Sequence, residues 1–173
     1  MPRLQALRIN ARELLREPGL QKSVDLSLPA AELGVDDARI TDDITIDLTV
    51  TSGVDSIVVH GTVRMPWRAQ CRRCLRDLQG TADIAVDEVY QDPDDEMVVD
   101  DEQAFPIEGD QIDLVPAVRE HLLLELPDDV LCHDDCAGIC PVCGTDLNDA
   151  TCDCDTSVRD ERWAALDDLR LDD

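Results

Sequence analysis

The eight cysteines of this sequence are grouped at spacings that are typical of metal-binding sites. Six of the eight lie between Cys132 and Cys154, and the other two belong to the segment Cys71-Arg72-Arg73-Cys74. The segment CPVCG at 140–144 has the form of a zinc knuckle, because two thiolates share one tight turn and a following glycine lets backbone amides face the sulfurs. The nearby CDC segment can complete a tetrahedron, and zinc binds four such ligands with bonds of about 2.3 Å to sulfur. The spacing therefore predicts a zinc site made of Cys140, Cys143, Cys152 and Cys154.

The four remaining cysteines predict a second site. Under the hypothesis that leaves no thiol unused, this site is made of Cys71, Cys74, Cys132 and Cys136. A rival grouping combines Cys132, Cys136, Cys140 and Cys143 and leaves the two outer pairs apart, and spacing alone does not decide between the two. A catalytic zinc keeps an open position and usually includes His or carboxylate ligands. The number of thiols therefore favours one or two structural Zn²⁺ ions, with His133 as an alternative ligand.

Other uses of the cysteines depend on the compartment. A disulfide framework belongs to oxidising compartments, but the segment MPRLQALRINARELL lacks the apolar core and the small-residue cleavage site of a secretory signal. No stretch approaches the ~18 apolar residues of a membrane span. These features predict a cytoplasmic protein with no membrane partner. Thiols that react with oxidants and release zinc are a further alternative.

A group of arginines surrounds the first cysteine pair and includes one aromatic residue. Such a patch can bind phosphates and stack on an unpaired base. The equally weighted alternative is that the arginines pair with acidic residues of the same chain. The candidate RNA-binding residues are Arg64, Trp67, Arg68, Arg72, Arg73 and Arg76.

The charge of the chain is strongly negative and unevenly placed. Of the formal net charge of −25, residues 1–90 carry −3 and residues 91–173 carry −22. The C-terminal half should therefore repel nucleic acid and anionic membrane surfaces. The acidic, weakly patterned segment 91–111 predicts a solvated loop. The sequence has no glycine-rich phosphate loop and no nucleophile–base spacing, so it predicts neither an enzyme nor a small-molecule substrate.

Apolar periodicity places the cysteines on a sheet and next to helices. Alternation predicts strands around Val24–Leu28, Ile44–Val50, Ile57–Met65 and Ala82–Val86, so the first cysteine pair lies between two consecutive antiparallel strands. Helices are predicted over Ala11–Glu17, capped by Asn10, from Asp113 to about Leu126, and after Ser157, where Trp163 docks the helix.

The predicted fold class is α+β. An antiparallel, barrel-like sheet carries packing helices and a C-terminal Cys-rich zinc segment. The predicted domains are a core over residues 1–130 with the acidic loop 91–111, a zinc knuckle segment over 131–156, and a C-terminal helix over 157–173 that docks on the core.

Taken together, these features resemble the YceD family, which is linked to the accumulation of large-subunit ribosomal RNA. The resemblance covers nearly the whole chain, with the first forty residues the least similar. The matching segments are Gly61-Thr62-Val63, Cys71–Leu75, Ile112-Asp113-Leu114, Leu126-Pro127, Leu131-Cys132, Cys136, Gly138, Cys140–Gly144, Leu147-Asn148, Cys152–Cys154 and Arg162–Leu166.

The resemblance implies a non-enzymatic factor that supports 23S ribosomal RNA synthesis or processing and large-subunit assembly. The implied partner is the 23S precursor or the pre-50S particle, bound directly or through a basic ribosomal protein. The charge of −22 in residues 91–173 opposes direct RNA contact, because RNA affinity arises largely from counterion release. An acidic module that chaperones a basic ribosomal protein is therefore the alternative.

Overall fold

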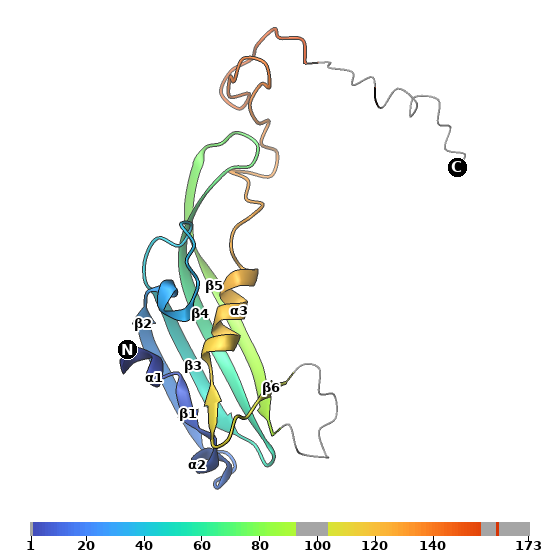
Figure 1. Cartoon of the computed structure of the whole chain (residues 1–173). Helices are drawn as coiled ribbons and strands as arrows, with labels where there is room; N and C mark the ends of the chain where they lie inside the picture. The colour runs from blue at the N-terminus through green and yellow to red at the C-terminus, as the bar shows by residue number, and fades with distance from the viewer. Residues whose placement is uncertain (1, 93–103, 157–161, 163–173) are drawn as a thin grey trace, which may run out of the picture. The chain divides into compact units, whose positions relative to one another are not determined.

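The computed structural model describes residues 2–92, 104–156 and 162 (Figure 1). The chain forms two compact units. The sheet unit comprises residues 1–69 and 79–128, and the cysteine unit comprises residues 70–78 and 129–173. In chain order the elements are α1 (Pro2–Gln5), β1 (Arg8–Asn10), α2 (Ala11–Leu15), β2 (Gln21–Leu28), η1 (Ala30–Leu33), β3 (Ile44–Ser52), β4 (Ser56–Gln70), β5 (Asp77–Gln91), β6 (Phe105–Pro106), β7 (Gln111–Asp113) and α3 (Val115–Leu124).

Five strands form the main sheet in the order β2-β3-β4-β5-β6. β2 and β3 pair antiparallel from Gln21 with Thr51 to Leu28 with Ile44, and β3 also pairs antiparallel with β4. β6 pairs parallel with β5 through Tyr90 and Phe105, so the sheet is mixed rather than wholly antiparallel. Among the described residues the sheet stays open, with β2 and β6 at its edges, and the barrel-like closure is not confirmed.

Strict alternation along β3 gives the sheet one buried face. Ile44, Ile46, Leu48 and Val50 are at most 1% exposed, whereas the threonines and Asp47 between them face the other side. Successive side chains of a strand point to opposite faces, so this pattern buries one face of the sheet against the rest of the unit. α3 covers this buried face, and its Val118 and Leu122 join the same core cluster as the β3 residues (Figure 1).

The two predicted helices of the sheet unit form, with shifted ends. The Asn10 side chain accepts a hydrogen bond from the Glu13 amide (2.9 Å), which caps α2 as expected, but the helix ends at Leu15. The N-cap of α3 is Leu114 rather than Asp113. Asp113 still contributes, because its Oδ1 accepts from the Val115 amide at 2.9 Å. None of the helices described combines the length and the apolar character needed to cross a lipid bilayer.

The expectation of a loop throughout residues 91–111 is wrong at its C-terminal end. Phe105 stacks on Tyr90 with ring centroids 5.4 Å apart, and Ile107 is only 7% exposed. These apolar contacts and the pairing of β6 with β5 order a segment whose sequence alone has no strand periodicity. Residues 93–103 lie outside the described residues, as does the helix predicted over 157–173, with Trp163, except for Arg162.

Candidate metal centres

Two turns of the cysteine unit have the same backbone hydrogen bonds. In the first turn, Cys71–Arg76, the Cys71 amide donates to the Arg76 carbonyl (2.9 Å) and the Leu75 amide donates to the Cys71 carbonyl (2.9 Å). In the second turn, Cys140–Thr145, the corresponding bonds are Cys140 amide to Thr145 carbonyl and Gly144 amide to Cys140 carbonyl, each 2.8 Å. Each turn therefore holds two thiols of a Cys-x-x-Cys pair on one side, as a zinc knuckle requires.

The first centre consists of Cys71, Cys74, Cys132 and Cys136. Its four Sγ atoms lie within 4.8 Å of one another. Cys71 Sγ is 3.7 Å from Cys136 Sγ, and Cys74 Sγ is 3.6 Å from Cys132 Sγ. A tetrahedron with Zn–S bonds of about 2.3 Å has sulfur–sulfur edges of about 3.8 Å, whereas a disulfide bond measures about 2.05 Å. The spacing of these thiols therefore fits a tetrahedral ion, and none of them is in a disulfide.

The second centre consists of Cys140, Cys143, Cys152 and Cys154, again with all four Sγ atoms within 4.8 Å. It is more accessible than the first centre, since Cys143 is exposed and Cys152 and Cys154 are half-buried. The Val142 amide donates to Cys140 Sγ at 3.4 Å, which is the amide–sulfur contact expected of a knuckle. The structure thus gathers the thiols into the two sets that use all eight cysteines. His133 belongs to neither set, and its Nδ1 lies 3.0 Å from Asp135 Oδ1.

The thiols of each centre differ in acidity. A hydrogen bond from the Cys74 backbone lowers the pKa of Cys71 to about 6, while burial raises the pKa of Cys132 to about 12. In the second centre, the Thr145 hydroxyl lowers the pKa of Cys143 to about 6, and the hydrogen bond with Cys143 raises the pKa of Cys154 to about 12. Four adjacent thiolates repel one another, so each centre ionises fully only when a cation neutralises it.

The Asn148 side chain, which is not a ligand, connects the two centres. In the sequence Asn148 lies between the two cysteine pairs of the second centre, yet its Nδ2 donates to Cys136 Sγ of the first centre (3.4 Å). Its Oδ1 accepts from the Ala137 amide at 2.7 Å. Such outer contacts orient metal ligands and tune their charge. Cysteine spacing predicts no role for Asn148, although Leu147-Asn148 lies between two ligand pairs in the sequence.

The six predicted RNA-binding residues do not all lie in one unit. Arg64, Trp67 and Arg68 belong to the sheet unit. Arg64 pairs with Asp83 (2.9 Å), and Arg68 Nε donates to the Ala38 carbonyl (3.2 Å). Strand alternation places Trp67 on the opposite face of β4 from the two arginines. A Cβ at Gly80 would lie 2.7 Å from the Trp67 ring, so this ring rests against the backbone of β5.

The other three predicted residues belong to the cysteine unit, and each has a partner there. Arg72 pairs with Asp129 (2.8 Å), and Arg73 Nη1 donates to the Cys136 carbonyl (2.8 Å). Arg76 Nη2 contacts the carboxylates of Asp146 (3.2 Å) and Asp149 (3.0 Å). The pairs of Arg72 and Arg76 match the alternative in which the arginines balance acidic residues of the same chain. The assignment of the six residues as RNA contacts stays a prediction.

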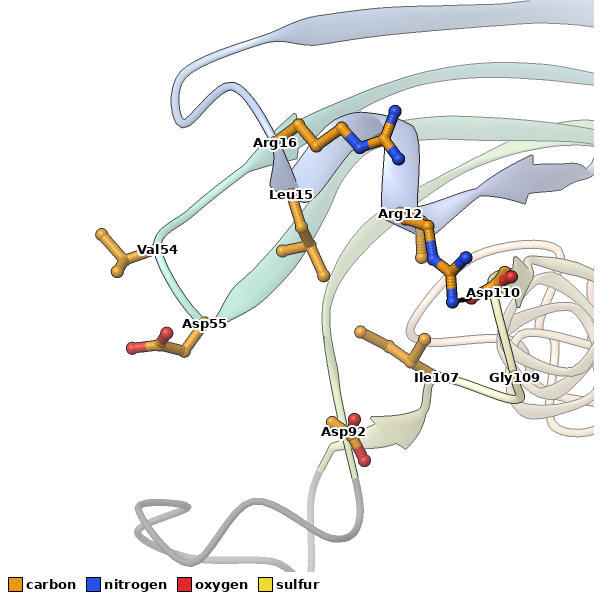
Figure 2. A pocket seen from close by; sticks show the side chains of 10 residues that line it. Arg12, Leu15, Arg16, Val54, Asp55, Asp92, Ile107, Gly109 and Asp110 are labelled. Carbon is orange, nitrogen blue, oxygen red and sulfur yellow. Dashed lines mark ion pairs between the residues drawn. The ribbon is translucent and has the colours of Figure 1, made fainter.

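A separate pocket of about 490 Å³ lies in the sheet unit, between α2, the β3–β4 turn and the segment before β7 (Figure 2). Its lining has charges of both signs, and Arg12 forms an ion pair with Asp110 at 2.8 Å. None of the residues that line it is a cysteine, serine or histidine that could act as a nucleophile or a proton-transfer imidazole. The metal centres are therefore the stronger candidates for a functional site.

Comparison with known proteins gives relatives across most of the chain. An uncharacterised protein of Mycobacterium tuberculosis is 33% identical over 137 residues, which cover 78% of this chain and 64% of that protein. An uncharacterised protein of Mycobacterium leprae is 30% identical over 138 residues, covering 76% and 63% of the two chains. The chain thus spans somewhat less than two thirds of the mycobacterial proteins.

A plant relative carries a functional name. The Arabidopsis thaliana protein called large ribosomal RNA subunit accumulation protein YCED homolog 1, chloroplastic, is 34% identical over 71 residues, which cover 41% of this chain and 22% of that protein. No solved structure matches the chain. The model of the family described as large ribosomal RNA subunit accumulation protein YceD matches residues 59–170 and so includes all eight cysteines. The chain therefore belongs to the YceD family.

Proposed function

We propose that this protein is a non-enzymatic factor that supports 23S ribosomal RNA synthesis or processing and large-subunit assembly, with structural zinc in both cysteine centres. The observation that carries the proposal is the presence of both four-cysteine centres inside the segment, 59–170, that matches the family of ribosomal RNA accumulation proteins. That description names an accumulation factor rather than a catalyst.

A structural role for the metal follows from the donor sets. Each centre offers four thiols, which fill a tetrahedral zinc and leave no position for a substrate. Zinc bound there would supply the cross-links that hold the knuckles, since structural zinc contributes on the order of 10–16 kcal/mol that is coupled to folding. The first centre joins Cys71 and Cys74 to Cys132 and Cys136, so it closes a long loop of the chain. In this assignment the segments 70–78 and 129–156 fold only with metal.

The proposed partner is the precursor of the large ribosomal subunit. Direct RNA contact would rely on Arg64, Arg68, Arg72, Arg73 and Arg76. The carboxylate partners of Arg64, Arg72 and Arg76 favour the second candidate, contact through a ribosomal protein, because an arginine paired with a carboxylate contributes less to phosphate binding. The net charge of −25 favours the same candidate, since an acidic surface attracts basic ribosomal proteins.

Ultraviolet crosslinking of the tagged protein in cells, followed by sequencing of the attached RNA, tests the proposal. Enrichment of 23S precursor at defined positions supports direct contact, and substitution of Arg68, Arg72 and Arg73 should then reduce it without loss of zinc. Absence of enrichment, in cells that need the protein for normal 23S levels, supports contact through a protein. Unchanged 23S accumulation after depletion of the protein would contradict the proposed function itself.

A further inference from the structure

Leu75 has a backbone conformation that is unfavourable for leucine. Its φ of +61° lies in the left-handed region, where a Cβ clashes with the backbone and carries a steric cost that glycine avoids. Burial does not compensate for this cost, because the Leu75 side chain is 55% exposed. The chain therefore keeps an exposed apolar side chain at a strained position, and such strain tends to mark functional sites.

The second knuckle shows what the turn itself requires. Gly144 occupies the position equivalent to Leu75, with the same hydrogen bond to the first cysteine of its turn and a φ of +75°. No atom lies within 4 Å of a Cβ built on Gly144, so the position is open to solvent. Glycine is thus the residue that this backbone geometry favours, and a leucine at this position does not stabilise the turn of the metal centre. The leucine in the first knuckle needs another explanation.

The surroundings of Leu75 have the composition of a protein-binding site. The three arginines of the turn, Arg72, Arg73 and Arg76, are exposed. Arg72 and Arg76 are neutralised by the carboxylates of Asp129, Asp146 and Asp149, and Arg73 donates to a backbone carbonyl. An exposed apolar side chain in a turn whose other exposed side chains are paired polar groups resembles the centre and rim of a protein interface.

We propose that Leu75 anchors the first knuckle in an apolar pocket on a protein component of the large-subunit precursor. This inference rests on the proposed function and specifies the partner class. RNA fits the site less well, because proteins recognise unpaired bases with aromatic rings or free guanidinium planes. Leu75 offers no ring, and the neighbouring guanidinium groups are engaged within the unit.

The test compares binding of purified variants to purified large-subunit precursor particles by sedimentation. Leu75→Gly removes the anchor and the backbone strain together, and Leu75→Asn is a second variant, because asparagine tolerates the left-handed region. Leu124→Ala is the matched control, because Leu124 is a leucine in the sheet unit that is 73% exposed. Both Leu75 variants should bind at least tenfold more weakly, as expected for an interface anchor, whereas Leu124→Ala should change binding less than twofold. Zinc content and resistance to urea should be equal to those of the wild type or higher.

Three results would overturn the inference. If Leu75→Gly or Leu75→Asn retains zinc and binds as tightly as the wild type, Leu75 is not an anchor, and the proposed function is unaffected. Equal loss of binding to protein-free precursor RNA would assign the contact to RNA instead of protein. A wild-type protein that binds neither the particle nor the RNA would contradict the proposed function, and the inference with it.

Discussion

Substitution of Asn148 tests whether the two metal centres depend on each other. Asn148→Ala removes the amide that donates to Cys136 Sγ (3.4 Å) and the oxygen that accepts from the Ala137 amide (2.7 Å). Loss of an outer partner of a metal ligand typically costs about 10–100-fold in metal affinity, or about 1.4–2.7 kcal/mol. Because Asn148 lies in the loop of the second centre but contacts a ligand of the first, the first centre should be the one that weakens.

The assay follows zinc release to a colorimetric chelator while N-ethylmaleimide labels each thiol as it becomes free. Peptide mapping then assigns the labels to centres. In Asn148→Ala, Cys136 should be labelled about tenfold faster than in the wild type. Thr151→Ala is the control, because Thr151 is exposed in the same loop. Equal labelling of Cys136 in Asn148→Ala and the wild type would refute the reasoning.

Three further predictions follow from local geometry. Gly80→Ala should lower the free energy of unfolding by about 1–3 kcal/mol in urea titrations, because its Cβ would lie 2.7 Å from the Trp67 ring, and an unchanged midpoint would contradict this packing. Hydrogen bonds from Arg39 lower the pKa of Asp37 to about 2 from 3.8. The pair therefore stabilises the fold above pH ~4 by about 1 kcal/mol and loses this contribution as the pH falls toward ~2, so the stability difference between wild type and Asp37→Asn should vanish there. Finally, with limiting chelator, the exposed Cys143 should be alkylated before any cysteine of the first centre, and the reverse order would contradict the difference in exposure.

Apolar alternation and the arrangement of the cysteines are the sequence patterns that predicted the strands and the two cysteine sets. The period of two in Ile44–Val50 predicted β3. Spacing predicted the site of Cys140, Cys143, Cys152 and Cys154, and the hypothesis that leaves no thiol unused predicted the other set that the structure gathers. An apolar residue at every second position places one face of a strand on the core of a half-buried sheet. The eight cysteines occur as four local pairs, and four pairs combine into two four-cysteine sites in only three ways.

Long-range contacts account for what the sequence did not predict. β6 exists because Phe105 stacks on Tyr90, and neither residue has a strand pattern that identifies its partner. The contact of Asn148 with Cys136 depends on two loops that meet only in the folded unit. The barrel-like closure could not be predicted from periodicity, because closure depends on register and shear between distant strands, which periodicity does not encode.

The metal content of the purified protein, combined with X-ray absorption at the zinc edge, shows whether both centres hold structural zinc. We expect two zinc ions per chain, each with only sulfur neighbours at about 2.3 Å, and loss of one ion on Cys71→Ser and of the other on Cys154→Ser. A single ion per chain, nitrogen or oxygen in the first coordination shell, or disulfides in place of metal would contradict this expectation.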